Sequence, residues 1–545
     1  MARIAPLSGF PEWLPQERMV EQHVLDVLRR TFELHGFAGI ETRAVEPLGQ
    51  LLRKGETSKE VYVLSRLQEV TETAADAVRR LLGADADAGT SASAGAGADA
   101  DAGAGGVSNR DGGRDGGGRS GLDEKSLGLH FDLTVPLARY VLENAGKLQF
   151  PFKRYQIQKV WRGERPQDGR FREFIQADVD VVGHGDLPYH FEVELPLVMA
   201  QALGQLRSIG LPEVRVLVNN RKVAEGFYTG IGLSDVEAVL RSIDKLDKIG
   251  ADAVAQLLVA QAGASPQQAQ ACLELAQISG NTVAVIDQIR ALAVQQGLDC
   301  EGGESSVAVD LFNEGLAELA ALLEAAALRA PGVVRADLKI ARGLDYYTGS
   351  VYETVLVGHE SLGSICSGGR YDTLASDGKN TYPGVGLSIG VSRLVSRMLA
   401  AGLTQVSRSV PTAVLVAVTQ EDQRPVSDAV AAQLRSRGIP CDVAPKAAKF
   451  GKQIQFADKR GIPYVWFPAA QPVAGQGTLG ASDGTVPVDG DVQTDGAVPV
   501  DGTGATESAR ASDQVKDIRS GDQVDADPAS WMPPARDLAP DITAA

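Results

Sequence analysis

The stretch RYQIQKVWRGERPQDGRFREFIQADVDVVG, residues 154–183, carries the strongest fold signal in this 545-residue chain. Its two halves alternate apolar and polar residues with a period of two, and a loop containing glycine separates them. Such alternation is typical of paired antiparallel strands. In the second strand the spacing places Gln176, Asp178 and Asp180 on one face, opposite the apolar residues. We therefore predict an antiparallel hairpin with one polar face.

The loop of this hairpin is rich in arginine, with Arg162, Arg165, Arg170 and Arg172 close together. Guanidinium groups bind phosphate through two parallel hydrogen bonds, so a cluster of them beside a polar strand face suits a polyanion. The alternative is a solvated loop beside a solvated strand face. Such a loop would more often use lysine and would not need the turn-forming Gly169. The pattern favours phosphate binding.

Outside the hairpin, three regions of the chain show different sequence patterns. Residues 17–34 repeat apolar positions at helical spacing, with Gly36 as a candidate helix end. Residues 220–330 are dominated by Ala, Leu and Gln and read as mostly helical. From Pro411 onward, apolar strand-like runs alternate with helical ones, which indicates a small parallel sheet covered on both faces. The predicted fold class is α+β: an antiparallel body with a helical insertion, followed by an α/β domain.

Two segments are too poor in large apolar residues to offset their ordering entropy, and we expect both to be disordered. They are residues 84–126, and residues 472–513 with their repeated VPVDG. Strand-like text flanks the first segment on both sides, which places it at the tip of a hairpin, where added length is entropically cheap. We expect neither insert to contribute to function. The alternative is that they have a regulatory binding role.

The net charge of −17 is unevenly spread. Residues 84–126 carry a net −4 and residues 472–545 a net −9, so the remainder is nearly neutral. Acidity therefore does not exclude an RNA partner. The four cysteines are far apart and show no metal-ligand spacing, and we found neither a signal-peptide core nor a run of eighteen apolar residues. We predict a cytoplasmic protein with reduced thiols.

Three further polar clusters stand out. RGLDYYTGSVYE, residues 342–353, combines Arg342 and Asp345 with three tyrosines in a chain that has only 5% aromatic residues. In HFDLTVPLARY, Asp132 and Thr134 are two residues apart, which predicts one face of a strand. The third cluster is SGGRYDTLA followed by PGVGLSIGVSRL, a glycine-rich strand leading into a helix that carries Arg393. No P-loop, Rossmann fingerprint, HExxH helix or GxSxG elbow is present.

These motifs resemble those of the histidyl-tRNA synthetases, a class II aminoacyl-tRNA synthetase family, over nearly everything outside the two inserts. RGERPQDGRFREF resembles the motif 2 loop, GVGLSIGVSRL is similar to motif 3, and GFAGIETRAVEPLGQL, with Pro47, is similar to motif 1. RGLDYYTGSVYE resembles the histidine-specific signature of the family. Ordinary half-buried strand tyrosines are the alternative reading of that last stretch.

The resemblance implies ATP-dependent ligation of histidine to tRNA(His) through a histidyl-adenylate, with release of diphosphate and AMP. Arg162 and Arg342 are the implied catalytic residues. The implied histidine-binding residues are Asp132, Leu133, Thr134, Arg162, Gln176, Asp180, Arg342, Tyr346 and Tyr347. Those for ATP are Arg162, Glu164, Arg170 and Arg393. ATP is a substrate, and Mg²⁺ is expected to accompany it, with no site made by protein ligands alone.

The resemblance also implies a homodimer through motif 1 and a C-terminal anticodon-binding domain. In that domain Lys449, Lys452, Lys459 and Arg460 are candidates to contact tRNA, although a solvated helix face would look the same. The expected domains are a catalytic body (1–83, 127–219 and 331–405), a helical insertion (220–330), an anticodon-binding domain (411–471 and 514–530) and a flexible tail (531–545).

Two alternatives from other functional classes remain. One is the regulatory subunit of ATP phosphoribosyltransferase, which shares the catalytic-body fold but generally lacks the C-terminal domain and the full tyrosine-bearing signature. The other is an RNA-binding or amino-acid-sensing module with an inactive synthetase body. Failure to form an adenylate would favour the second.

Overall fold

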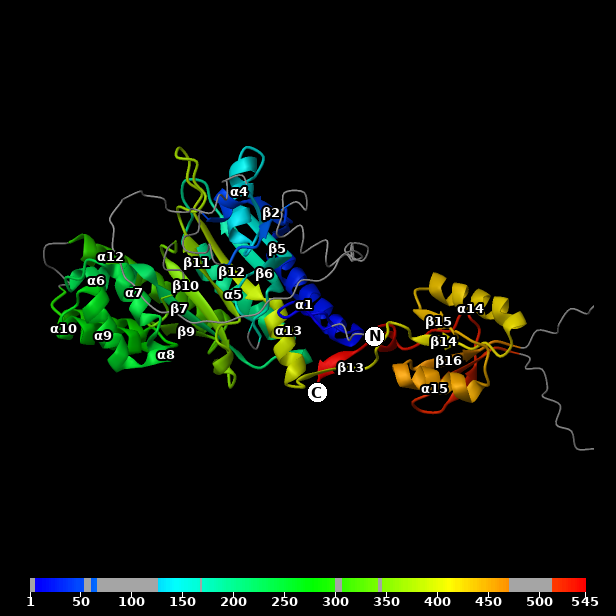
Figure 1. Ribbon diagram of the computed structural model, residues 1–545. Helices are drawn as coiled ribbons and strands as arrows, with labels where there is room; N and C mark the ends of the chain where they lie inside the picture. Colours follow the sequence, from blue (N-terminus) through cyan, green and yellow to red (C-terminus); the bar gives the residue numbers. More distant parts are fainter. Residues whose placement is uncertain are drawn as a thin grey trace, which may run out of the picture. The chain divides into compact units, whose positions relative to one another are not determined.

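The computed structural model describes residues 5–52, 60–65, 126–166, 169–298, 306–341, 346–469 and 512–545 (Figure 1). The chain divides into two compact units. The first holds Glu21–Thr404 with short terminal pieces, and the second holds Gln405–Thr543 with Trp13–Val20. Each unit is considered by itself.

A nine-stranded sheet forms the centre of the first unit. Its strand order is β1 (Ala38–Gly39), β5 (Phe152–Trp161), β6 (Glu173–Val182), β12 (Gly384–Gly390), β11 (Cys366–Tyr371), β10 (Ser350–Leu356), β7 (Val214–Asn220), β9 (Val334–Asp337) and β8 (Ser279–Gly280). From β5 to β7 every neighbouring pair is antiparallel. The predicted hairpin is confirmed as β5 and β6, which pair from Phe152–Val182 to Trp161–Glu173.

The two faces of this sheet have different partners. The registers place Val179, Leu387 and Tyr352 on one face, where the Tyr352 hydroxyl donates to the Glu192 carbonyl at 2.7 Å. Glu192 belongs to helix α5 (His190–Gln205), so α5 covers this face. Helix α13 (Val391–Ala400) packs against β6, and its Ser392 donates a hydrogen bond to Glu21 of helix α1 (Pro15–Leu34) at 3.5 Å. The opposite face carries the polar residues of β6.

The described residues between 221 and 329 are mostly helical, as predicted. The described helices are α6 (Arg221–Gly230), α7 (Val236–Ile243), α8 (Leu246–Ile249), α9 (Ala251–Ala262), α10 (Pro266–Gln277), α11 (Ala284–Gln295) and α12 (Val307–Arg329). Helix α12 packs along α6 and also contacts α5, so the helical region adjoins the β7–β9 end of the sheet.

A small sheet of β2 (Val45–Pro47), β4 (Leu127–Leu129) and β3 (Val63–Leu64) lies beside α2 (Leu48–Leu51) and α4 (Thr134–Asn144). Antiparallel pairing of β3 with β4 confirms the hairpin expected around residues 84–126, most of which lie outside the described residues. The strand predicted for Asp132 and Thr134 is wrong. Thr134 begins α4, and the Asp132 carboxylate accepts a hydrogen bond from Val135 N at 3.1 Å, which satisfies a backbone donor of the first helical turn.

The second unit is the predicted α/β domain. Its sheet has the order β15 (Cys441–Val443), β14 (Val414–Val416), β16 (Tyr464–Phe467), β17 (Gln514–Asp517) and β18 (Gln523–Asp525). The first three strands are parallel, whereas β17 and β18 are antiparallel additions. Apolar side chains of helices α14 (Arg424–Ser436) and α15 (Phe450–Arg460) join two separate buried clusters, so both faces of the sheet are covered, as predicted.

Residues 531–545, which we expected to form a flexible tail, contain a 3₁₀ turn at Ala535–Asp537 and the strand β19 (Ile542–Ala544), paired with β13 (Thr404–Val406). Trp531 packs edge-on against Trp466 at a centroid separation of 5.5 Å. The buried Asp537 accepts hydrogen bonds from Tyr464 and Arg519. This proline-rich segment forms no α-helix, but it packs against the sheet of the second unit. No helix in the described part of the chain is long and apolar enough to cross a membrane.

Candidate active site

The polar face of β6 lies inside the molecule rather than in solvent. Gln176 is 7% exposed, Asp178 2% and Asp180 3%. The registers place Ser388 of β12 and Ser367 of β11 on the same face, next to Asp178. Burial of this many polar groups requires partners or a ligand, because an unsatisfied buried group is costly. The alternative of a solvated face is therefore wrong.

A cavity of about 360 Å³ opens at one end of this face. It is bordered by the β5–β6 loop, β6, the turn before β11, β12 and α13. Its lining residues are Arg162, Glu164, Gly169, Arg170, Phe171, Phe174, Gln176, Ser364, Ile365, Cys366, Ser367, Ser388, Gly390 and Arg393. Five residues predicted for histidine or ATP from the sequence therefore meet at one cavity: Arg162, Glu164, Arg170, Gln176 and Arg393.

Three arginines give the cavity a positive rim. The Arg162 Nε donates to the Phe131 carbonyl at 3.0 Å, and its guanidinium stands 5.3 Å from the Phe174 ring centroid. Arg393 donates to the Ser364 carbonyl at 3.0 Å, which fixes its direction. Arg170 is half exposed and only 3.7 Å from Glu164. Three guanidinium groups placed around one cavity can surround a chain of phosphates.

The floor of the cavity contains a directed chain of hydrogen bonds. Gln176 Nε2 donates to Ser388 Oγ at 3.0 Å, and the Ser388 hydroxyl bonds to the Asp178 carboxylate. The chain leaves Gln176 Oε1 and Asp178 Oδ1 as buried acceptors with no partner in the described part of the molecule. Buried acceptors without donors favour a ligand that brings N–H groups.

Asp180 is held deeper on the same face. Its Oδ2 is 2.7 Å from Arg154 Nη2, and its Oδ1 accepts a hydrogen bond from Tyr371 at 2.8 Å. Arg154 is completely buried, so this ion pair is shielded from solvent. Neither Arg154 nor Tyr371 was among the residues predicted for the site. The alternation of β5 and β11 could have shown that both lie on the face of Asp180.

Tyr346 and Tyr347 lie next to each other, with ring centroids 4.2 Å apart. Burial raises the pKa of the Tyr347 hydroxyl, and the neighbouring Tyr346, Asp180 and Tyr371 add to this effect. The tyrosine pair and Asp180 thus share one environment, as predicted. These residues do not border the 360 Å³ cavity, nor do Asp132, Leu133 and Thr134. Arg342 and Asp345 lie outside the described residues.

The chain matches the model of the histidyl-tRNA synthetase family over residues 121–394 and that of the anticodon binding domain over residues 412–473. It is 54% identical to a histidine–tRNA ligase of Bifidobacterium longum subsp. infantis, over 98% of each chain. Against the corresponding ligase of Micrococcus luteus, the identity is 53% over the full length of both. The chain belongs to the histidyl-tRNA synthetase family.

A crystal structure of histidyl-tRNA synthetase from Nostoc sp. superposes with a TM-score of 0.69 at 30% identity, covering 96% of this chain and 97% of that one. The predicted α+β class II fold with a C-terminal anticodon-binding domain is therefore confirmed. A full-length match to enzymes, including the C-terminal domain, favours a histidyl-tRNA synthetase over the regulatory-subunit alternative.

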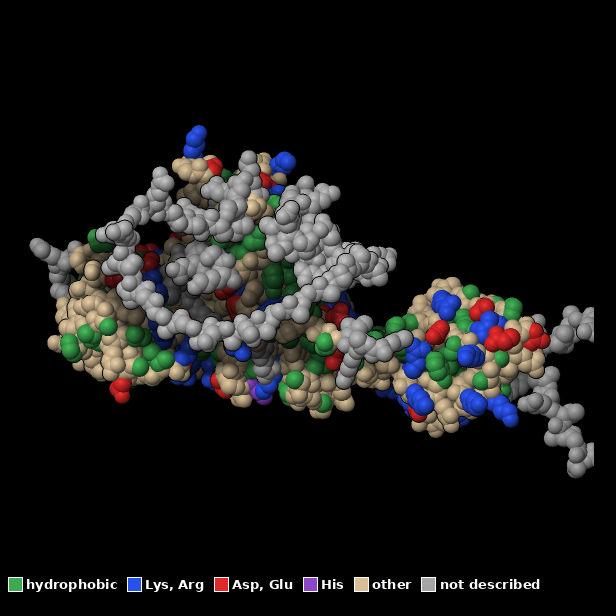
Figure 2. All heavy atoms as spheres, viewed as in Figure 1, with side chains coloured by type: hydrophobic (Ala, Val, Ile, Leu, Met, Phe, Trp, Pro, Cys, Tyr) green, Lys and Arg blue, Asp and Glu red, His purple; other side chains and the backbone are tan. Residues whose placement is uncertain are grey.

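The basic residues predicted for tRNA lie on or beside α15, in the domain that matches the anticodon-binding family. Lys449, Lys452 and Lys459 are exposed, and their spacing of three and seven residues keeps them on one side of the helix. Arg460 is 37% exposed and stands over the Phe456 ring. Figure 2 shows several Lys and Arg side chains on the visible face of the second unit, with Asp and Glu side chains among them. This is the pattern expected of a phosphate-contacting surface.

Proposed function

We propose that the cavity between the β5–β6 loop and α13 binds ATP and that the buried face beside it binds histidine. The overall reaction is ATP-dependent attachment of histidine to tRNA(His). The proposal rests on one observation. On one face of the sheet, a cavity rimmed by arginines adjoins buried hydrogen-bond acceptors that lack partners among the described residues, and Gln176 belongs to both.

Arg162, Arg170 and Arg393 bind the triphosphate. The Arg162 Nε contacts the Phe131 carbonyl, one residue before Asp132, which belongs to the proposed histidine site. It therefore binds the α-phosphate together with the histidine carboxylate. Arg393 and Arg170 bind the outer phosphates. The adenine stacks on Phe174 at the cavity wall, where Glu164 also lies.

Histidine supplies the donors that the floor lacks. Gln176 Oε1 accepts a hydrogen bond from its ammonium group, and Asp132 and Thr134 approach that group from the start of α4. Tyr346, Tyr347 and Asp180 enclose the imidazole. An amino acid without imidazole N–H groups would leave such buried partners unsatisfied, which can cost about 10⁴–10⁵ in specificity.

The carboxylate of histidine attacks the α-phosphorus, and the histidyl-adenylate and diphosphate form. A terminal ribose hydroxyl of tRNA then attacks the activated carbonyl and releases AMP. Charge builds on phosphoryl oxygens in the first step, so fixed guanidinium groups aimed at them stabilise the transition state. Orientation of the carboxylate by Arg162 supplies the remaining catalysis. Arg342 is assigned to the opposite side of the same phosphate.

Mg²⁺ is proposed to enter with ATP. In such sites it is usually held by substrate phosphates, water and one or two carboxylates, and it neutralises phosphate charge. Glu164 is the carboxylate that lines the cavity, which fits that donor set. No cluster of three potential metal ligands occurs among the residues that the structure describes.

We further propose a cytoplasmic homodimer in which residues 1–83, 127–219 and 331–405 form the catalytic body. Residues 220–330 form the helical insertion, and residues 411–471 with 514–530 form the anticodon-binding domain, onto which Trp531 and Leu538 of the following segment also pack. Lys449, Lys452, Lys459 and Arg460 contact the tRNA backbone.

Two variants test this assignment by their opposite effects. Gln176→Leu removes an acceptor for an ammonium group and is expected to raise the KM for histidine about 10–100-fold, with the KM for ATP nearly unchanged. Arg393→Gln removes a phosphate contact and should raise the KM for ATP instead. Both constants are measured by ATP–diphosphate exchange. Equal effects of either variant on both constants would contradict the division of the site.

A further inference from the structure

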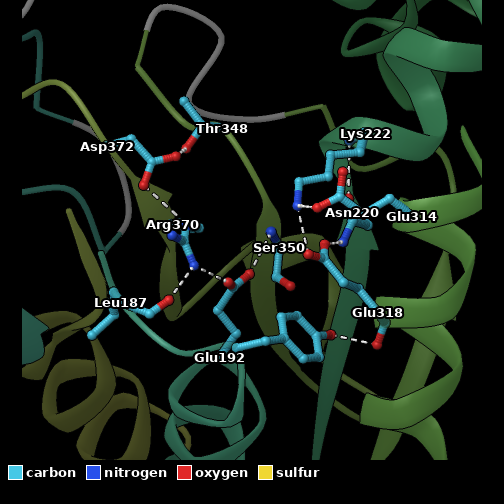
Figure 3. A network of polar contacts seen from close by, with 11 residues as sticks. Leu187, Glu192, Asn220, Lys222, Glu314, Glu318, Thr348, Ser350, Arg370 and Asp372 are labelled. Atoms are coloured by element: carbon cyan, nitrogen blue, oxygen red, sulfur yellow. Dashed lines mark hydrogen bonds and ion pairs between the residues drawn. The ribbon is translucent and has the colours of Figure 1, made fainter. Parts of the chain in front are cut away.

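A buried ion pair lies on the helix-covered side of the sheet, opposite the polar face of β6. Arg370 of β11 and Glu192 of α5 meet there, with Nη1 and Oε1 2.7 Å apart (Figure 3). The register of Arg370 with Val385 and Val181 shows that its side chain leaves the sheet on this side. Neither residue borders the 360 Å³ cavity. The pair therefore stands behind the proposed site.

The pair holds the chain that follows the two tyrosines. Glu192 Oε2 accepts a hydrogen bond from Ser350 N at 3.0 Å, while Arg370 Nε donates to Asp372 Oδ1 at 3.0 Å. Asp372 in turn accepts the Thr348 hydroxyl at 2.5 Å. The backbone N–H of Thr348 donates to the Arg370 carbonyl at 2.9 Å. Figure 3 shows these side chains converging on Arg370.

Gly349 passes directly over the pair. A Cβ placed there would lie 2.9 Å from Arg370 Cδ and 3.0 Å from Glu192 Oε2, so the backbone is in contact with both partners. On the other side of the sheet the Tyr347 ring packs against Gly369, where a Cβ would lie 3.0 Å from the ring. Tyr347 and Gly349, the two neighbours of Thr348 in the chain, thus pack closely against β11 and have little conformational freedom.

Breaking the Arg370–Glu192 ion pair costs free energy, so the pair can hold its neighbouring residues in one conformation. Glu192 is completely buried and the Arg370 side chain is 17% exposed. Burial raises the pKa of the Glu192 carboxyl, and its bond to Arg370 opposes that rise. Loss of either partner leaves an uncompensated buried charge, so the two side chains have few alternative arrangements.

We propose that Arg370, Glu192 and Asp372 are positioning residues for histidine recognition: they anchor Thr348–Ser350 and thereby fix Tyr346 and Tyr347. This inference rests on the proposed function, because it assumes that the tyrosines enclose the imidazole. It predicts that damage to the anchor weakens histidine binding and spares ATP binding, which depends on other elements.

A second polar cluster in Figure 3 supplies a matched control. Lys222 of α6 pairs with Glu314 at 2.8 Å and with Glu318 at 2.5 Å, both on α12. It is also a partly buried ion pair of the first unit, 19% exposed at the lysine, but it makes no hydrogen bond to residues 346–350 among those described. Lys222→Met removes comparable ionic contacts and leaves the anchor side chains unchanged, while the neighbouring Arg221 N–H donates to the Gly349 carbonyl at 2.9 Å.

The test measures the KM for histidine and for ATP by diphosphate exchange in the full-length protein. Arg370→Met and the milder Thr348→Val are compared with Thr348→Ser, which keeps the hydroxyl, and with Lys222→Met. Thermal unfolding identifies variants that do not fold, and Thr348→Val keeps the test valid if Arg370→Met fails. We expect Arg370→Met and Thr348→Val to raise the KM for histidine about 10-fold, with the KM for ATP within about 2-fold. Thr348→Ser and Lys222→Met should match the wild type.

The outcomes separate this inference from the proposed function. If the wild type shows histidine-dependent exchange but Thr348→Val and Arg370→Met leave the KM for histidine unchanged, the anchor has no role in recognition. The same conclusion follows if both KM values rise together or if Lys222→Met has the same effect. A folded wild type with no histidine-dependent exchange overturns the proposed function and the anchor with it.

Discussion

The environment of Asp178 in the structure differs from the one that its position in the sequence indicates. In the alternating strand it looks like one of three solvated polar positions, yet it is buried next to Arg154, Asp180 and Asp132. Burial raises the pKa of its carboxyl to about 7, although Arg154 opposes the rise. The sequence indicated which face Asp178 occupies. Its burial depends on distant chain segments that cover the sheet, and the period of one strand does not encode those.

This environment predicts a pH-dependent effect of Asp178→Asn on stability. Below about pH 3 the carboxyl is mostly neutral in both the folded and the unfolded chain. As pH rises toward 7, the unfolded chain ionises first, so the wild type loses free energy of unfolding relative to the variant, by up to about 4 kcal/mol in total. Above pH 7 the difference is constant. Urea unfolding of both proteins at pH 5 and pH 8 checks this, and a difference independent of pH would contradict the raised pKa.

At the scale of elements, the sequence predicted strands and helices best where one period runs over many residues. The β5–β6 hairpin, the helices of 221–329 and the alternating C-terminal elements were all predicted. It failed for Asp132 and Thr134, because the polar–apolar alternation before Pro136 also fits the start of a helix, and the capping contact of Asp132 decides the outcome. Arg154 was missed as a site residue because its partner Asp180 lies on another strand.

Helix α15 carries a prediction of its own. Lys452 and Lys459 are exposed on one side of the helix, so the double variant Lys452→Glu/Lys459→Glu should raise the KM for tRNA(His) at least about 10-fold through lost phosphate contacts. Histidine-dependent exchange needs no tRNA and should be unchanged. Aminoacylation and exchange are measured side by side. The matched control is Lys147→Glu/Lys248→Glu, which makes the same charge change at exposed lysines of the first unit. An unaltered KM for tRNA would remove α15 from the RNA interface.

At the scale of the whole molecule, a nearly neutral body carries two acidic inserts. Strands β3 and β4 pair directly across the first insert, so the fold of the small sheet does not require its length. Composition alone predicted both inserts, because the segments lack residues that could form a core, and nearly all of residues 84–126 and 472–513 lie outside the described residues. Composition did not predict that the chain after the second insert returns to pack Trp531 against Trp466, since that contact joins sequence-distant aromatic residues.

Replacement of residues 86–122 by a short Gly/Ser linker is therefore expected to leave the KM for histidine and for ATP within about 2-fold of the wild type, because loop-closure entropy changes slowly with length. Thermal unfolding and diphosphate exchange of the shortened chain check this. A large rise in the KM for histidine alone would assign the insert a role over the pocket that contains Asp132.

The central claim, that this chain activates histidine, is tested most directly by ATP–diphosphate exchange with each of the twenty amino acids in turn. The acceptor floor and the tyrosine pair predict exchange that depends on histidine and on no other amino acid. Exchange with a different amino acid, or none from the folded protein, would contradict the account.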